Sequence, residues 1–290
     1  MGLPVVQTSS QTSSNTNASS VVITKPTGLA VGDLMVAFVG FMHTGSSGQS
    51  VSTPSGWTSL QQVNQNRVVF AAYYKVADSA DVAASNFTFS FSTTVDQSGG
   101  SILRIDNFVS SNIIGTSEVD SETSPADAVI SHTAASTPIS ANTLYLLGFG
   151  YGNQSTGAAF TASSYTITPS VTLTEAVDTS VQEGGGSGLA FGIAVAYGSI
   201  ERTSQITEYG VTLSQTPNRA EVSILILING SYSVSTDVSH LAITPTIEGV
   251  TASSVNVATD VSHLAITPTI NGIEVDDSPE NAVWTTIIKS

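Results

Sequence analysis

Short apolar segments of strand length recur along most of the chain. Residues 33–39 (DLMVAFV) form an almost unbroken apolar run, which is typical of a strand buried on both faces. Residues 87–91 (FTFSF) alternate with a period of two, which places their Phe rings on one face of a sheet. Residues 68–76 and 102–105 are further strand candidates, and only residues 78–84 have a briefly helical pattern. The pattern therefore predicts an all-β fold.

A second series of strand-like segments repeats the first in the same order. Residues 144–149 match residues 34–38, and residues 161–166 match residues 53–58. The later matches are residues 189–197 with 68–74, residues 210–214 with 87–90, and residues 224–227 with 102–105. Two related half-units of about residues 21–109 and 137–230 are expected, each with an apolar face that the other half can cover. The predicted product is a jelly-roll-like β-sandwich over residues 21–230.

The start of the chain has a different character. Residues 7–20 (QTSSQTSSNTNASS) contain a single apolar residue, Ala18. Residues 1–20 are therefore expected to form a flexible or extended N-terminal arm. Two interpretations stay open, a disordered terminus and an arm that becomes ordered on a partner.

The last part of the chain contains an internal repeat. Residues 236–247 (TDVSHLAITPTI) recur unchanged as residues 259–270, at an offset of 23. The copies are followed by Glu248-Gly249 and Asn271-Gly272, and Asn-Gly between apolar runs is a strong signal for a hairpin turn. Residues 231–290 are therefore predicted to form a C-terminal region of β-hairpins. Since an isolated hairpin is only marginally stable in water, these hairpins must pack on the sandwich, on copies of themselves or on another protein.

Composition narrows the possible functions. The 290 residues include seven Lys plus Arg against 22 Asp plus Glu, for a net charge of −15. Nucleic acids and anionic membranes both attract clustered cations, so neither is an expected partner. The absence of Cys excludes disulfides, iron–sulfur clusters and Cys-based zinc sites. No apolar run reaches the length of a membrane helix, and the first residues lack the pattern of a signal peptide.

The C-terminal region holds four candidate assembly residues. His240 and His263 occupy equivalent positions of the repeat, and the simplest interpretation is a structural His hydrogen-bonded to an Asp of the same copy. The alternatives are a metal site on a threefold axis, with one His from each of three chains, and a pH-sensitive contact. Trp284 and Ile287 lie in a terminal apolar strand, where they are candidates either for a subunit or partner contact or for ordinary packing.

Two further groups are candidate ligand sites. Residues 118–127 contain four carboxylates and are expected to form an acidic loop between the half-units, either solvated or bound to a hard cation such as calcium. Trp57 and Tyr165 stand at matching positions of the two half-units, and together with residues 73–74 they are a candidate platform for stacking sugars. Ordinary core packing is the other interpretation of these aromatic residues.

Several segments together resemble a known family. They are Lys25-Pro26, residues 31–38 (VGDLMVAF), 53–57 (TPSGW), 73–77 (YYKVA) and 87–89 (FTF). In this order they resemble a β-sandwich domain of bacteriophage virion proteins and some bacterial surface proteins. The resemblance covers roughly residues 21–230 and implies a non-enzymatic structural or adhesive module of tail, fibre or head-accessory proteins. It brings no catalytic residues and does not include the C-terminal repeat.

The leading hypothesis is a structural component of a bacteriophage virion: a capsid decoration, head-fibre or tail-accessory protein. Such a protein would be made in the host cytoplasm without a cofactor. It would assemble on the major capsid or tail protein and on copies of itself, with a homotrimer favoured. The alternative is a carbohydrate-binding adhesin or receptor-binding protein that contacts host-surface glycans. A glycan-cleaving enzyme is a third possibility, but that chemistry needs two facing carboxylates and the sequence singles out no such pair.

Overall fold

The computed structural model describes residues 3–45, 48–123, 125, 127–139, 142–154, 159–182, 188–200 and 204–230. Residues 1–232 form one compact unit, distinct from residues 233–290. The predictions made for residues 231–290, including those for His240, His263, Trp284 and Ile287, lie outside the described residues.

The first half of the unit contains seven described strands and one short helix. The strands are β1 (Val5–Ser14), β2 (Ala18–Thr24), β3 (Leu34–Met42), β4 (Thr58–Gln65), β5 (Val68–Val76), β6 (Asn86–Val95) and β7 (Gln97–Asp106), and the helix is α1 (Ser79–Ala83). Five strands form an antiparallel sheet in the order β1-β7-β3-β5-β4, and β2 pairs with β6 in a small second sheet. An isolated bridge between Val51 and Phe91 adds a short segment to the free side of β6.

The second half repeats this strand order. Its strands are β8 (Ile114–Thr123), β9 (Val129–Ile139), β10 (Thr143–Gln154), β11 (Ala162–Thr168), β12 (Thr174–Gln182), β13 (Leu189–Ile200), β14 (Ser204–Leu213) and β15 (Ala220–Asn229). The large sheet has the order β8-β15-β10-β13-β12, and the small sheet has the order β9-β14-β11. Strand for strand this is the arrangement of the first half, with the Val51 segment in place of β11. Four of the five sequence matches between half-units fall on equivalent strands, which are β3 and β10, β5 and β13, β6 and β14, and β7 and β15. The fifth does not, because residues 53–58 lie mostly in the turn before β4 and residues 161–166 lie mostly in β11.

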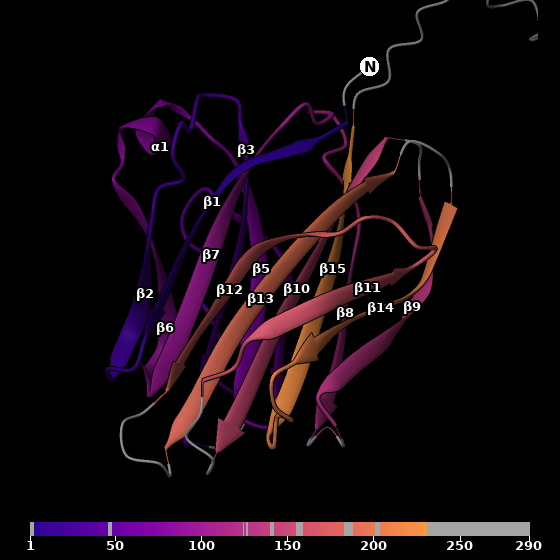
Figure 1. Ribbon diagram of the computed structural model, residues 1–290. Coiled ribbons are helices and arrows are strands. Elements are labelled where there is room, and N and C mark those ends of the chain that lie inside the picture. Colours follow the sequence, from indigo (N-terminus) through magenta and orange to yellow (C-terminus); the bar gives the residue numbers. More distant parts are fainter. Residues whose placement is uncertain are drawn as a thin grey trace, which may run out of the picture. The chain divides into compact units, whose positions relative to one another are not determined.

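The four sheets stack as layers around three hydrophobic cores. The central core lies between the two large sheets and includes Phe38 and Phe70 from the first half and Phe191 and Ile224 from the second. Two outer cores separate each large sheet from its own small sheet. Figure 1 shows the strands of the first half, in indigo and purple, on one side of those of the second half, in magenta to orange. Strand β3 is buried along its whole length, so the prediction of a strand covered on both faces is confirmed.

The all-β sandwich predicted from the sequence is thus confirmed, but its layering differs from the prediction. Each half was expected to supply one face and to be covered by the other. Instead, each half is already two-layered, because its own small sheet covers the outer face of its large sheet. The apolar pattern shows that β3 and β5 are covered on both faces without showing what covers them. The jelly-roll description stays a prediction.

Glycines on β10 let aromatic rings of the first half reach the backbone of the second. A Cβ built on Gly148 would lie 2.3 Å from a ring carbon of Phe38, and one on Gly150 would lie 2.7 Å from the ring of Phe70. A Cβ built on Gly152 would likewise lie 2.5 Å from Cγ2 of Val68. Since these glycines alternate with Phe149 and Tyr151, the face of β10 toward the first half is flat where the rings lie. This complementarity fixes the register between the two large sheets.

The edges of the two large sheets are joined to each other by polar side chains. On one side, the Ser9 hydroxyl of β1 donates to the carbonyl of Ala176, 2.9 Å away, and Asn15 donates to the carbonyl of Gln182 at 3.2 Å. On the other side, the Gln61 amide of β4 donates to the Ser117 carbonyl of β8 at 3.0 Å. Each joined edge has less free backbone for pairing with another chain.

Residues 5–14 of the predicted flexible or extended arm are extended, but they form part of the sandwich. This segment is β1, a ten-residue edge strand in which nine residues pair with β7. Its short polar side chains form hydrogen bonds with β12 and with the loop before β3. The Thr8 hydroxyl, for example, donates to the Thr27 carbonyl at 2.9 Å. An edge strand held by such bonds needs no apolar alternation, and its sequence resembles that of a disordered terminus.

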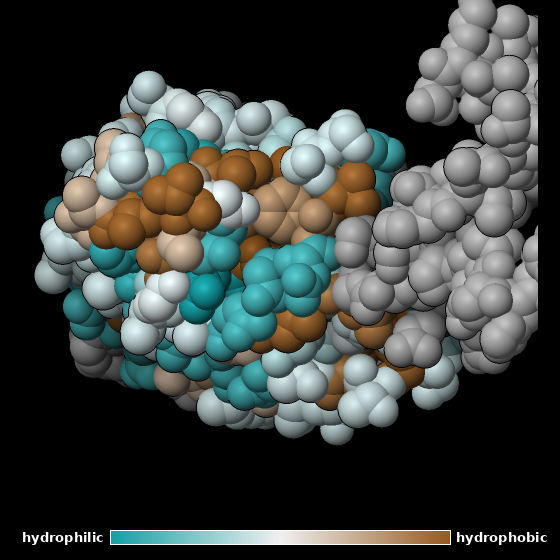
Figure 2. Space-filling view, turned by 90° about the horizontal axis from the view of Figure 1, so that it is seen from above, coloured by the Kyte–Doolittle hydropathy of each residue, from teal (hydrophilic) through white to brown (hydrophobic). Residues whose placement is uncertain are grey.

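The end of the unit that carries α1 has a mixed surface, with hydrophobic and hydrophilic residues side by side (Figure 2). The helix begins with a capping box between Asp78 and Asp81, and Lys75 pairs with Asp81 at 2.7 Å. Exposed valines lie nearby, including Val31 at 66% and Val76 at 40% exposure. Among the helices that the structure describes, none is long and apolar enough to cross a membrane.

Candidate functional site

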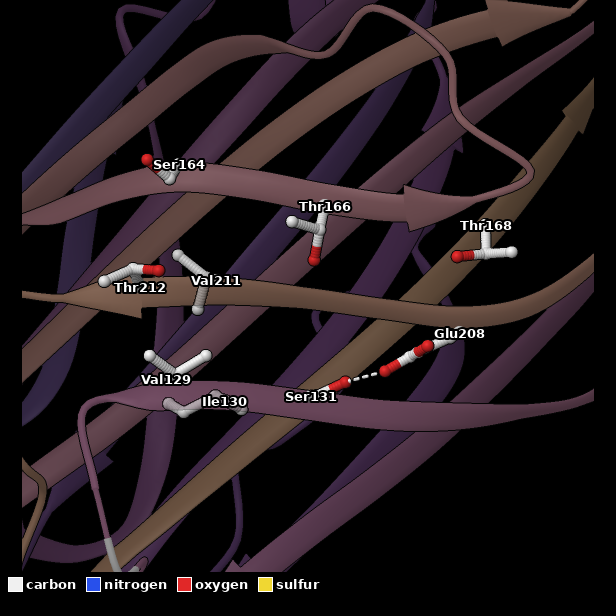
Figure 3. A pocket seen from close by; sticks show the side chains of 9 residues that line it. All are labelled: Val129, Ile130, Ser131, Ser164, Thr166, Thr168, Glu208, Val211 and Thr212. Atoms are coloured by element: carbon white, nitrogen blue, oxygen red, sulfur yellow. Dashed lines mark hydrogen bonds between the residues drawn. The ribbon is translucent and has the colours of Figure 1, made fainter.

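A groove of about 370 Å³ crosses the outer face of the small sheet of the second half (Figure 3). Its walls carry the hydroxyls of Ser131 on β9, Ser164 and Thr166 on β11, and Thr212 on β14. Glu208 contributes a carboxylate, which accepts a short hydrogen bond from the Ser131 hydroxyl. Of the apolar residues along the groove, Val129 is exposed, whereas the side chains of Ile130 and Val211 belong to the core beneath it. The groove therefore combines hydrogen-bonding groups with a few methyl groups, which suits a small polar ligand.

Gly210 lies between two residues that line this groove, Thr166 and Ser131. It pairs with Thr166 on one side and with Ser131 on the other, and it belongs to the central strand β14. A Cβ at this position would lie 2.2 Å from the carbonyl oxygen of Ile130 and 3.1 Å from the Thr166 hydroxyl. Glycine is therefore required for β9 to approach β14 closely, and it leaves the centre of the sheet without a side chain.

A buried polar cluster lies beneath the groove. His132 is next to Ser131 in β9 and so points to the opposite face, toward β15 of the large sheet. Its Nε2 lies 2.6 Å from Oε2 of Glu221, which has no exposed surface, and its Nδ1 lies 3.0 Å from Oδ2 of Asp120. Tyr209 packs beside the ring, and its hydroxyl is 3.2 Å from the hydroxyl of Ser223. This Asp120–His132–Glu221 cluster links β8, β9 and β15.

Burial and neighbouring charges shift the pKa values of Glu221 and His132 in this cluster. Burial raises the pKa of Glu221 to about 7, although His132 acts to lower it. Burial acts to lower the pKa of His132, but the hydrogen bond and the charge of Glu221, followed by the charge of Asp120, outweigh burial and raise it. The cluster therefore retains protons near neutral pH that free Glu and His side chains would release.

The geometry of the cluster favours holding a proton over transferring one to a ligand. Both ring nitrogens of His132 are hydrogen-bonded to carboxylates on opposite sides of the ring, so neither is free to accept a proton from a nucleophilic hydroxyl. The Oε1 atom of Glu221 is buried without a hydrogen-bond partner, as expected for a carboxyl group that is neutral for part of the time. Among the described residues, no group of three His, Asp or Glu side chains is placed to hold a metal ion.

The structure does not form the aromatic platform proposed from the sequence. Trp57 is only 8% exposed and meets the rings of Phe87 and Phe89 edge-on in the outer core of the first half. Tyr165 is partly buried against the equivalent core of the second half, with its ring centre 6.3 Å from that of Phe149. The two residues lie in different cores and in different kinds of element, since Trp57 precedes β4 and Tyr165 belongs to β11. Trp57 and Tyr73 are both buried, so neither offers an exposed ring face for a sugar.

The predicted acidic loop is also wrong for most of its length. Glu118, Asp120 and Glu122 lie in β8, which pairs with β15. Asp120 bonds to His132, and Asp127, beyond the strand, accepts a bond from the backbone N–H of Val129. The alternation of carboxylates marks the polar side of an edge strand. A run with so few apolar residues looks like a loop when only the sequence is considered.

The buried cluster was missed by sequence reasoning, although one signal for it exists. Glu221 is the single charge in residues 220–228 (AEVSILILI), which otherwise read as a strand covered on both faces. A carboxylate in such a strand needs a buried partner. The identity of that partner, His132, depends on the position of β9 and has no local sequence signal.

No family model, curated protein or solved structure matches the chain. What can be stated of its class therefore comes from its own fold: a duplicated antiparallel β-sandwich with four layers.

Proposed function

We propose that this protein is a structural component of a bacteriophage virion that acts by assembly onto the particle. The observation that carries the proposal is the combination of a rigid, duplicated β-unit with a C-terminal segment containing an exact 23-residue offset repeat. Joined edges on both sides of the large sheets suit a module that must survive as a spacer on a particle surface without aggregating. The sequence resemblance to virion β-sandwich domains supports the same role.

The first test concerns assembly of the full chain. We expect native mass spectrometry to give a homo-oligomer, with a trimer favoured, because the repeat in residues 231–290 needs a partner surface to be stable. Purified virions from a host that carries the coding sequence should contain the chain in a fixed ratio to the major capsid or tail protein. A monomer with a fully protected C-terminal segment in hydrogen exchange, together with absence from the virions, would contradict the proposal.

A carbohydrate-binding adhesin is a second candidate, now favoured by the groove over Gly210 and no longer by Trp57. Hydroxyls from three strands and the Glu208 carboxylate offer donors and acceptors of the kind that sugars use. The groove carries no aromatic ring, so a bound glycan would depend on hydrogen bonds and weak apolar contacts. Each site would accordingly bind a glycan weakly, and the overall affinity would rise if several copies of the chain bound the same surface.

A glycan array with the full chain tests this candidate. We expect any signal to fall at least tenfold in Glu208→Gln and in Thr166→Val, since the first removes the carboxylate charge of the groove and the second a hydroxyl, neither in a core. Thr88→Val is the matched control, because Thr88 is exposed on β6, the strand equivalent to β14 in the first half. A signal that survives both groove substitutions, or no signal on the array, excludes the groove as a glycan site.

A further inference from the structure

Three of the five cations among the described residues have a carboxylate or a backbone carbonyl as partner. Lys75 pairs with Asp78 and Asp81, Arg104 pairs with Asp33 at 2.6 Å, and Lys25 donates to a backbone carbonyl. The two others, Arg67 and Arg219, come from different halves of the unit. Within the part of the chain that the structure describes, neither guanidinium lies within 4.0 Å of a carboxylate.

Both of these arginines instead converge on a single neutral oxygen. Nη1 of Arg67 donates to Oε1 of Gln154 at 2.8 Å, and Nη2 of Arg219 donates to the same oxygen. The Nε atom of Arg219 is buried and has no hydrogen-bond partner. Two positive charges therefore share one amide carbonyl in a chain whose net charge is −15. This arrangement has more donors and more positive charge than its acceptor can satisfy.

The surrounding backbone holds the three side chains in place. Arg67 belongs to the two-residue turn between β4 and β5, in which Asn66 and Arg67 both have positive φ, at 39° and 78°. The Asn66 side chain donates to the carbonyl of Arg219 at 2.6 Å, which ties this turn to the start of β15. The Asn218 amide bonds both the N–H and the C=O of Gln154, each at 2.7 Å. The site is thus preorganised by contacts between the two halves.

We propose that Arg67 and Arg219 form a binding site for a carboxylate, which takes the place of the Gln154 amide oxygen between the two guanidinium groups. A carboxylate is the planar anion with the shape of that amide, and it offers acceptor positions to several N–H groups at once. It also neutralises part of the positive charge, which the amide cannot do. Guanidinium groups hold such planar anions in paired hydrogen bonds.

Neighbouring ionisable groups fit this assignment. His43 is buried beside Arg67, and burial followed by the charge of Arg67 lowers its pKa, while Asp96 acts to raise it. His43 therefore stays neutral and adds no further charge to the site. The overall negative charge of the chain repels anions at long range, but this effect is screened beyond about 10 Å at 0.1 M salt. Binding is expected to show as a direct contact effect at moderate ionic strength.

The test compares sodium acetate with sodium chloride at equal ionic strength, using the full chain and thermal unfolding. At ten times its dissociation constant, acetate should raise the unfolding midpoint of the wild type by about 3–6 °C over chloride. The ¹⁵Nε–¹Hε signals of Arg67 and Arg219 should shift in the same titration. The same titration with sodium phosphate tests whether the site prefers a planar to a tetrahedral anion. Glucuronate and a Glu-containing peptide distinguish a sugar acid from a protein side chain as the natural source.

The decisive variant is Gln154→Glu, which places a carboxylate in the site permanently. It should unfold at a higher temperature than the wild type and lose the specific response to acetate. Gln11→Glu is the matched control, since Gln11 is exposed on β1 and adds the same charge far from these arginines. Equal effects of acetate and chloride on the wild type would overturn the proposal. So would an acetate response that persists in Gln154→Glu or in Arg67→Gln.

Discussion

Replacing Gly148 with valine is expected to lower the free energy of unfolding by about 3 kcal/mol, because the new side chain would occupy the space of the Phe38 ring. The Cβ alone would lie 2.3 Å from that ring, in the central core where neither neighbouring strand can move freely. Chemical denaturation monitored by fluorescence and by circular dichroism measures the change.

A second substitution separates crowding from a general loss of strand stability. Phe38→Ala alone should cost about 3–5 kcal/mol through the cavity it leaves. The double variant Phe38→Ala/Gly148→Val should lose at least about 1 kcal/mol less than the sum of the two single losses. The reason is that the valine side chain fills part of the cavity, and the cavity removes the clash. Gly99→Ala is the comparison for milder crowding, since its Cβ would lie 3.3 Å from the carbonyl oxygen of Thr12, a close contact but far less severe than 2.3 Å. Strict additivity of Phe38→Ala and Gly148→Val would show that the two halves do not pack ring against glycine.

Removing His132 is expected to destabilise the protein strongly at pH 8 and much less at pH 5. His132→Ala leaves Glu221 buried without a partner, and a lone buried charge costs about 3–5 kcal/mol. At pH 5 Glu221 is protonated, since burial raises its pKa to about 7, and the cost falls to that of a lost side chain and hydrogen bond. Urea unfolding of the variant and the wild type at both pH values measures the difference.

The wild type should itself be more stable in mild acid than in mild base. The pKa values of Glu221 and His132 are both raised in the folded state, so folding binds protons. The stability that this provides is present below the ordinary pKa values, 4.5 for Glu and 6.5 for His, and is lost as the pH rises through the folded values, about 7 for Glu221. Glu221→Gln should flatten this slope, whereas Glu208→Gln, on the exposed groove, should not. An equal slope in both variants would assign the pH dependence to other groups.

Periodicity along the chain determined the strands well, because burial of apolar side chains acts on each segment locally. The all-buried pattern of residues 34–39 predicted a strand covered on both faces, and the repeat of segments at 144–149 and 224–227 predicted an equivalent second half. The predictions failed for two polar segments, which were expected to be an arm and a loop. They are the edge strands β1 and β8, which side-chain hydrogen bonds hold in place, and such bonds leave no apolar pattern in the sequence.

The sites depended on contacts between residues far apart in the sequence. His132 and Glu221 meet only because β9 lies over β15, and Arg67 and Arg219 meet only because a turn of the first half touches a loop of the second. The sequence by itself determined an all-β chain with a duplicated order of strands, since apolar alternation needs no knowledge of the partner strand. Only the tertiary structure decided which layer covers which face and which charges share a site, because those depend on the packing of whole sheets.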